Sequence, residues 1–239
     1  MAEARGPPVR TGARRVPPPM TTIIDYGIGN LRSLEKAFRA AGVAVERTGD
    51  PDRIGRAGRL VLPGVGAFGA CADALRQRGL DRLVAERARA GVPLLGVCVG
   101  MQLLFESSDE RPGPDGAPHA GLALLPGRVV RFPRGLADAD GRRLKVPHMG
   151  WNRLRRRAAH PVLGDAEPYV YFVHSYHAAP ARPSDVLATV AYGVEVPAVV
   201  GRHNVVGVQF HPEKSAGAGL AMLRRFAAWT PAAEPAPAA

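Results

Sequence analysis

The chain has 239 residues, of which 46% are hydrophobic, enough to bury the core of one large domain or two small ones. No apolar run reaches the ~18–20 residues that a membrane span requires, and two cysteines, Cys71 and Cys98, are too few for a disulfide framework. The net charge of +11 suggests a nucleic-acid partner, but the arginines are scattered and lack interleaved aromatic residues. We therefore expect a cytoplasmic protein that binds neither nucleic acid nor a membrane.

Both ends of the chain have a composition typical of disorder. Residues 1–19 are rich in proline, glycine and arginine, and residues 230–239 form a low-complexity tail of alanine and proline. No apolar stretch follows the arginines of residues 1–19, as it would in a signal peptide. No linker-like segment divides the rest, so one folded domain is expected over residues 20–229.

A strand is predicted over residues 21–26, followed by a glycine-rich loop at 27–30. Asn30 is expected to cap a helix whose apolar residues recur with helical spacing, and Gly42 is expected to end it. Strand, glycine pair and helix suggest a dinucleotide-binding fingerprint, but its third glycine would fall on Arg32. The loop nevertheless lies at the carboxyl end of a strand, where α/β proteins place ligand and partner contacts.

Further strands are predicted over residues 43–47 and 59–62, and helical patterns over residues 70–89. The strand at 59–62 leads into the segment 63–69, which is rich in small and turn-forming residues. Such a backbone exposes N–H groups or approaches a ligand closely. The alternation of strands and helices predicts a doubly wound, mostly parallel sheet.

The segment 93–105 carries the strongest chemical signal. A buried strand is predicted over 93–97 and a helix from Val99 onward, with Gly96-Val97-Cys98-Val99-Gly100 between them. This is the form of a nucleophile elbow, whose glycines let strand and helix approach each other. The helix N-terminus offers free N–H groups and a partial positive charge, which favour a thiolate and later an oxyanion. Cys98 is therefore the candidate nucleophile, because a cysteine that merely fills a core needs no flanking glycines.

After a polar loop at 106–121, the apolar runs become shorter and are separated by turns. Because no linker intervenes, we expect these runs to add antiparallel strands to the same sheet rather than form a second domain. Residues 217–229 have helical spacing. The apolar runs are 129–132, 169–173, 186–191, 198–200 and 205–210.

A cysteine nucleophile needs a base, and the base needs an orienting group, because a free thiol has a pKa of about 8.5. Among the seven histidines, His211 follows an apolar strand and precedes Glu213 by two residues. The carboxylate of Glu213 can hold Nδ1 of the ring and leave Nε2 for Cys98, which predicts a triad. His174 and His177 lack the further ligands of a zinc site, so neither a metal nor another cofactor is expected.

The elbow together with His211-Pro212-Glu213 resembles the class I, or triad, glutamine amidotransferases. The resemblance covers roughly residues 20–228 and implies a flavodoxin-like, doubly wound α/β fold, mostly parallel with antiparallel additions. Val99 stands where members often carry leucine, which matters little because a backbone N–H is needed there. Five segments resemble the glutaminase subunits of imidazole glycerol phosphate synthases in particular: 24–31, 63–68, 147–152, 171–176 and 209–215.

The resemblance implies that Cys98 attacks the side-chain amide of glutamine, forms a γ-glutamyl thioester and releases ammonia. Water then hydrolyses the thioester to glutamate. The N–H of Val99 and the loop containing Gly64 and Val65 are expected to bind the oxyanion, and a change in the orientation of that loop would gate the enzyme. The residues expected to hold glutamine are Gln102, Ser175 and Tyr176.

The implied partner is a (β/α)₈-barrel cyclase subunit, which forms a heterodimer with the glutaminase and receives its ammonia. The cyclase makes imidazole glycerol phosphate and aminoimidazole carboxamide ribonucleotide in histidine biosynthesis. Asn30, Trp151 and Asn152 are the expected interface residues. The alternatives are a glutaminase of another class I system, such as pyridoxal phosphate or anthranilate synthesis, a γ-glutamyl hydrolase, a catalytically silent scaffold, and a basic nucleic-acid-binding protein.

Overall fold

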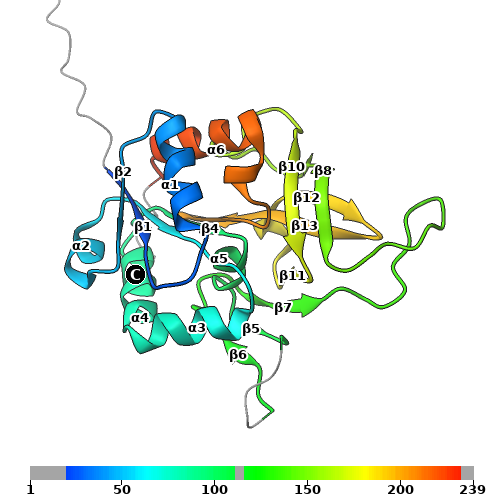
Figure 1. The fold of residues 1–239 in the computed structure, drawn as a ribbon, viewed down its shortest axis with the longest axis horizontal. Coiled ribbons are helices and arrows are strands. Elements are labelled where there is room, and N and C mark those ends of the chain that lie inside the picture. Colours follow the sequence, from blue (N-terminus) through cyan, green and yellow to red (C-terminus); the bar gives the residue numbers. More distant parts are fainter. Residues whose placement is uncertain (1–19, 111–115, 233–239) are drawn as a thin grey trace, which may run out of the picture.

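The structure, a computed structural model, describes residues 20–110 and 116–232 (Figure 1). The disorder expected for residues 1–19 and 230–239 concerns segments outside this described part, apart from residues 230–232, which follow α6 without regular secondary structure. Within residues 20–110 and 116–232, no helix is long and apolar enough to cross a membrane.

Eight strands form the main sheet, in the order β2-β1-β3-β4-β14-β13-β12-β9. Neighbours from β2 to β14 run parallel, and β13, β12 and β9 continue the sheet antiparallel. The predicted doubly wound, mostly parallel sheet with antiparallel additions is confirmed. In spatial order the strands are β2 (Val45–Thr48), β1 (Thr21–Ile24), β3 (Leu60–Leu62), β4 (Leu94–Val97), β14 (Val205–Val208), β13 (Val194–Arg202), β12 (Val186–Tyr192) and β9 (Arg155–Arg156).

Helices cover both faces of this sheet, with α1 and α6 on one side and α3, α4 and the short α5 on the other (Figure 1). Gly42, predicted to end the first helix, adopts a left-handed φ of 75° just beyond α1. The helical segment at 70–89 is divided in two at Gly79, whose φ is 65°. The helices are α1 (Leu31–Ala40), α2 (Pro51–Arg56), α3 (Phe68–Gln77), α4 (Leu80–Arg89), α5 (Val99–Gln102) and α6 (Ala216–Ala228), with 3₁₀ turns η1 (Pro183–Asp185) and η2 (Pro212–Lys214).

Two of the apolar runs expected in the main sheet lie in separate small sheets, which corrects that prediction. β10 (Tyr169–His174) pairs antiparallel with β8 (His148–Arg153), and a second sheet has the order β11-β7-β5-β6. Burial alternates along β8 and β10, whereas every residue of β4 and β14 is buried. Strands with one solvated face are unsuited to the interior of a parallel sheet, which helices cover on both faces. The second sheet consists of β11 (Tyr176–Pro180), β7 (Gly127–Arg131), β5 (Ser107–Ser108) and β6 (His119–Ala120).

Candidate active site

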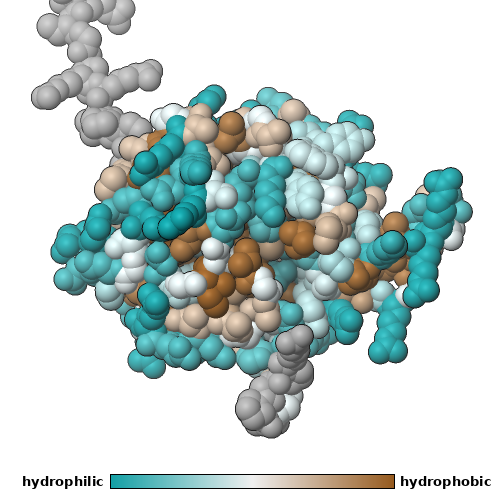
Figure 2. Space-filling model, in the orientation of Figure 1, coloured by the Kyte–Doolittle hydropathy of each residue, from teal (hydrophilic) through white to brown (hydrophobic). Residues whose placement is uncertain are grey.

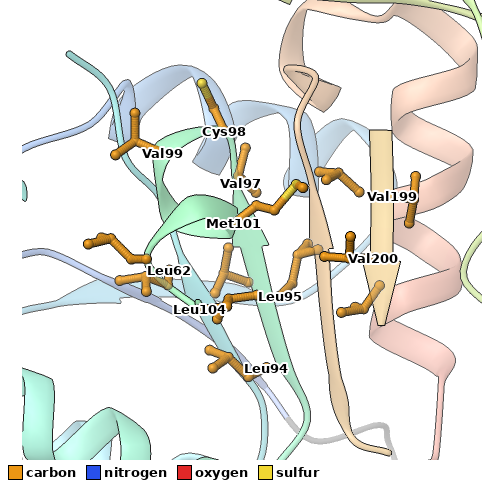
Figure 3. Packing of buried hydrophobic residues seen from close by; sticks show 14 of the residues in the cluster. Leu62, Leu94, Leu95, Val97, Cys98, Val99, Met101, Leu104, Val199 and Val200 are labelled. Atoms are coloured by element: carbon orange, nitrogen blue, oxygen red, sulfur yellow. The ribbon is translucent and has the colours of Figure 1, made fainter. Parts of the chain in front are cut away.

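Cys98 lies at the turn between β4 and α5 and has a φ of 56° and a ψ of −113°. A side chain in this left-handed region costs of order 1–3 kcal/mol, so the surrounding structure must impose it. A Cβ on Gly96 would lie 2.6 Å from the carbonyl oxygen of Gly100, and a Cβ on Gly100 would lie 1.9 Å from that of Leu62. Both glycines are therefore required for the close approach of β4, α5 and β3. In Figure 3 the sulfur of Cys98 points away from the apolar cluster beneath the turn.

β14 pairs in parallel with β4 and brings His211 to the same edge of the sheet as Cys98. The Nδ1 of His211 lies 2.9 Å from Oε1 of Glu213, and the two side chains are only 4% and 3% exposed. This contact leaves Nε2, which is buried without a hydrogen bond to another described residue, for the thiol. Burial alone would lower the pKa of His211, but the neighbouring Cys98, together with the hydrogen bond and the charge of Glu213, raises this pKa to about 10. The imidazole is thus held in its protonated form at neutral pH.

Asn30 also contacts the buried carboxylate. Its Nδ2 donates to Oε1 of Glu213 at 3.4 Å, and its side chain makes no capping hydrogen bond to α1. Asn30 does occupy the N-cap position of α1, where its backbone carbonyl accepts from the N–H of Leu34, but the predicted side-chain cap does not form because the amide group is directed to Glu213. Asn30 lines the cavity at the site, and its place in a partner interface stays a prediction.

The loop that follows β3 lies against the N-terminus of α5. A Cβ on Gly64 would lie 2.6 Å from the backbone nitrogen of Gly100 and 2.9 Å from Cβ of Val99. Only glycine allows the loop this close to the N–H groups that begin α5. Two backbone segments that expose N–H groups thus converge beside Cys98, as an oxyanion hole requires.

A cavity of about 420 Å³ opens over Cys98 and His211. This size suits a small ligand. Its described lining includes one carboxylate, Glu110, and one ammonium, Lys214, neither of which the sequence analysis singled out as a site residue. The lining residues are Asn30, Val65, Gly66, Cys98, Val99, Gln102, Glu110, Pro147, Val173, His174, Ser175, Tyr176, His211 and Lys214.

Gln102 lines the cavity but is only 3% exposed. Its Nε2 donates to the carbonyl oxygen of Tyr176 and to Oε1 of Gln209, both at 3.0 Å. Nε2 of Gln209 in turn lies 3.9 Å from the sulfur of Cys98. The amide nitrogen of Gln102 is therefore engaged within the protein, where it ties the β10–β11 corner to the elbow. Ser175 and Tyr176 lie at that corner and line the cavity, and their role in holding glutamine stays a prediction.

Two buried histidines, His148 and His174, lie behind the same corner, and the sequence analysis considered only His174, as a possible metal ligand. His148 Nδ1 and His174 Nε2 are 3.0 Å apart, and His174 Nδ1 donates to the Tyr176 carbonyl at 2.9 Å. His174 Nε2 is therefore the acceptor and His148 carries its proton on Nδ1. Burial lowers the pKa of His148 to about 4 and that of His174 to about 3, so both rings are neutral. Pairing of the two residues across β8 and β10, which a sequence pattern does not specify, is the feature that identifies them.

Asn152 and Trp151 occupy opposite faces of β8. Nδ2 of Asn152 points to Nε2 of His148 at 3.4 Å and donates to the carbonyl of Ala191 at 2.9 Å. Trp151 is 53% exposed. Its neighbours Met149 and, on β10, Tyr169 are each 61% exposed. The exposed face therefore carries three large, largely apolar side chains beside the charged Arg153, whereas the other face carries the buried histidines.

The chain matches the glutamine amidotransferase class-I family over residues 22–228. It is 55% identical over 214 residues to the imidazole glycerol phosphate synthase subunit HisH of Salinibacter ruber, covering 87% of this chain and 94% of that protein. Identity to the HisH subunit of Geobacillus thermodenitrificans is 50% over 208 residues, with the same coverage.

Two solved structures resemble this one in fold. A glutamine amidotransferase aligns with a TM-score of 0.66 at 19% identity, covering 87% of this chain and 99% of that one. The PurLQS structure from Thermotoga maritima also gives 0.66, at 17% identity, and covers 88% of this chain and 97% of that one. These likenesses support the fold assignment.

Proposed function

This chain belongs to the class I glutamine amidotransferases, in the HisH family of imidazole glycerol phosphate synthase subunits, and we propose how its site releases ammonia from glutamine. It is a glutamine amidotransferase of histidine biosynthesis. The observation that carries the proposal is that Cys98 and His211 line the same cavity, while Oε1 of Glu213 lies 2.9 Å from Nδ1 of His211.

In the first half of the reaction, the Cys98 sulfur attacks the side-chain amide carbon of glutamine. The carbon–nitrogen bond breaks as His211, protonated at neutral pH, donates a proton to the departing nitrogen, and ammonia leaves. In the second half, His211 takes a proton from water, which attacks the thioester carbonyl. The carbon–sulfur bond breaks, glutamate is released and the sulfur is free for another cycle. Glu213 holds the ring throughout by its contact with Nδ1.

The backbone of the elbow and loop supplies the oxyanion site. The N–H of Val99 at the start of α5 is one donor, and the peptide joining Gly64 to Val65 supplies the other, since the loop packs against that helix end. Glu110 is the carboxylate available for the ammonium of the substrate. Ser175 and Tyr176, held at their corner by Gln102, border the part of the cavity in which glutamine lies.

The cyclase subunit is the proposed recipient of the ammonia, because ammonia released into bulk water would be protonated and lose its nucleophilicity. The exposed apolar face of β8 and β10, with Met149, Trp151 and Tyr169, is the proposed docking surface. Exposed aromatic residues grouped in this way are typical of the centre of an interface. Both cysteines are free, which supports a cytoplasmic location for the complex.

The test is to co-express the full chain with the cyclase subunit and to assay glutamine-dependent cyclisation. We expect the two to purify together and ammonia transfer to require Cys98. Glutamine turnover that no cyclase stimulates would contradict the proposed partner, and no glutamine turnover in the complex would contradict the proposed reaction.

A further inference from the structure

Two buried side chains behind the cavity hold the carbonyl groups of the loop that follows β3. The phenol of Tyr26 donates to the carbonyl oxygen of Pro63 at 2.7 Å. The thiol of Cys71 donates to the carbonyl oxygen of Val65 at 3.3 Å. Tyr26 follows β1 and is 1% exposed, whereas Cys71 lies in the first turn of α3 and is fully buried. Two elements far apart in the sequence therefore converge on three consecutive loop residues.

Both groups act as donors because both keep their protons. Burial, together with the nearby Cys71 thiol, raises the pKa of the Tyr26 phenol. Burial also raises the pKa of the Cys71 thiol, against the opposing effects of the nearby Tyr26 hydroxyl and of the hydrogen bond to the Val65 carbonyl. Removing either donor would leave a buried carbonyl without a partner, which is costly. The two contacts are therefore specific constraints on the loop.

The constraints bracket a single peptide group. The carbonyl of Pro63 belongs to the Pro63–Gly64 peptide, and the carbonyl of Val65 belongs to the Val65–Gly66 peptide. The group between them, the Gly64–Val65 peptide, makes no hydrogen bond to any other described residue. With its two neighbours held, this peptide has a defined position beside Val99 and Gly100, against which Gly64 packs.

We propose that Tyr26 and Cys71 are positioning residues for the oxyanion hole. They hold the peptides on either side of the Gly64–Val65 group, so that its N–H lies in register with that of Val99 when charge develops on the substrate oxygen. Neither side chain lines the cavity, so neither touches glutamine. The inference rests on the proposed glutaminase function and deepens it.

Near-isosteric variants of the full chain test the proposal. Tyr26→Phe removes only the hydroxyl, Cys71→Ala removes the thiol, and Cys71→Ser keeps a donor at the same place. Thr22→Val is the matched control, since it removes a hydroxyl on the buried strand β1 that donates to Glu46 on the neighbouring strand β2, away from the loop. Glutamine hydrolysis is measured with and without the cyclase subunit.

Two further measurements separate positioning from loss of structure. Alkylation of Cys98 by iodoacetamide, followed on the Cys98 peptide by mass spectrometry, reports the reactivity of the sulfur in a reaction that forms no oxyanion. Glutamine binding is measured in the Cys98→Ala background, where no turnover occurs. A disordered site would change both, whereas a misplaced oxyanion donor changes neither.

We expect kcat to fall about tenfold in Tyr26→Phe and in Cys71→Ala, as small displacements of catalytic groups cost rates of this order. Cys71→Ser and Thr22→Val should stay within about twofold, and alkylation and glutamine binding should be unchanged. A kcat that stays the same or rises in both donor-removing variants would overturn the proposal, as would a parallel fall in alkylation. If the unsubstituted chain does not hydrolyse glutamine, the proposed function itself fails.

Discussion

The carboxyl edge of the main sheet and the β8–β10 pair contribute to the same cavity by different means. At the sheet edge, the strands are buried throughout, and the reacting groups sit on a backbone forced into shape by glycines around Cys98. Along β8 and β10, residues alternate between a buried face with two neutral histidines and an exposed face with Met149 and Trp151. The sheet edge fixes the chemistry through main-chain geometry, whereas the strand pair places side chains for positioning and recognition.

The space-filling view shows how hydropathy is distributed over one face of the molecule. In Figure 2 apolar residues gather near the middle of the face, bordered by hydrophilic residues on the left and on the projecting segment at the right. That segment lies between β7 and β8 (Figure 1). The carbonyl of Tyr176 joins the regions, since it accepts from Gln102 on the elbow helix and from His174 on β10. A change at the sheet edge should therefore affect the chemical step, and a change in the strand pair should affect binding.

The largest expected effect is at the nucleophile. Cys98→Ala should reduce glutamine hydrolysis at least about a thousandfold, because no other described residue that lines the cavity carries a thiol to form the thioester. Binding of glutamine and of the cyclase should persist, since the sulfur supports neither surface. Isothermal titration with both partners checks this, and turnover near that of the unsubstituted chain would refute the assignment.

Glu213→Gln should reduce kcat by about a hundredfold, since the ring of His211 loses its orienting carboxylate. The same change should lower the pKa of His211 from about 10 toward its ordinary 6.5, because a charge that raises it is lost. A group whose pKa is raised by folding stabilises the fold below about pH 6.5, and this stabilisation is lost as the pH rises toward 10. The free energy of unfolding should therefore fall less steeply over that interval in Glu213→Gln.

Denaturant unfolding at a series of pH values measures this slope, and a titration of the His211 ring by NMR gives the pKa directly. Glu213→Asp serves as the control that keeps the charge. Equal slopes in the unsubstituted chain and in Glu213→Gln would show that Glu213 does not set the protonation of His211.

On the strand pair, Trp151→Ala should weaken binding of the cyclase roughly thirtyfold, which corresponds to about 2 kcal/mol for an aromatic residue at the centre of an interface. The stability of the chain alone should hardly change, because Trp151 is 53% exposed. Glu86→Ala on the outer face of α4 is the control and should leave the affinity unchanged. Surface plasmon resonance measures both affinities. An unaltered affinity in Trp151→Ala would contradict the proposal that this face of β8 contacts the cyclase.

The smallest effect is expected for His148, behind the corner between β10 and β11. His148→Phe keeps the ring stacked between Phe172 and Tyr192 but removes the hydrogen bond to His174. Loss of one such bond is worth about 1 kcal/mol, so KM for glutamine should rise about fivefold while kcat changes little. The control is His160→Phe. The ring of His160 packs against Trp229 away from the cavity, so this change should leave both constants unchanged. Steady-state kinetics decides, and a fall in kcat alone would place His148 with the chemical step.

The difference between the regions also explains what could be predicted from the sequence. The elbow around Cys98 and the spacing of His211 and Glu213 are local patterns, so both were predicted. The contact of Gln102 with Gln209 spans 107 positions and depends on the parallel pairing of β4 with β14, which no local pattern encodes. The apolar run at 169–173 predicted β10 but not its partner, and β8 (His148–Arg153) has no apolar run that would predict a strand, so their separate sheet was missed. Glu110 lies in a polar loop whose composition gives no sign of a site.

The central claim is that glutamine is cleaved through a covalent bond to the sulfur of Cys98, with His211 as acid and base. The most direct measurement is rapid acid quenching of the full chain with glutamine, followed by mass spectrometry of the Cys98 peptide. The account predicts a γ-glutamyl adduct on Cys98 that forms together with ammonia and disappears as glutamate is released. Ammonia release with no adduct on that peptide, in a chain whose Cys98→Ala variant still turns over, would contradict it.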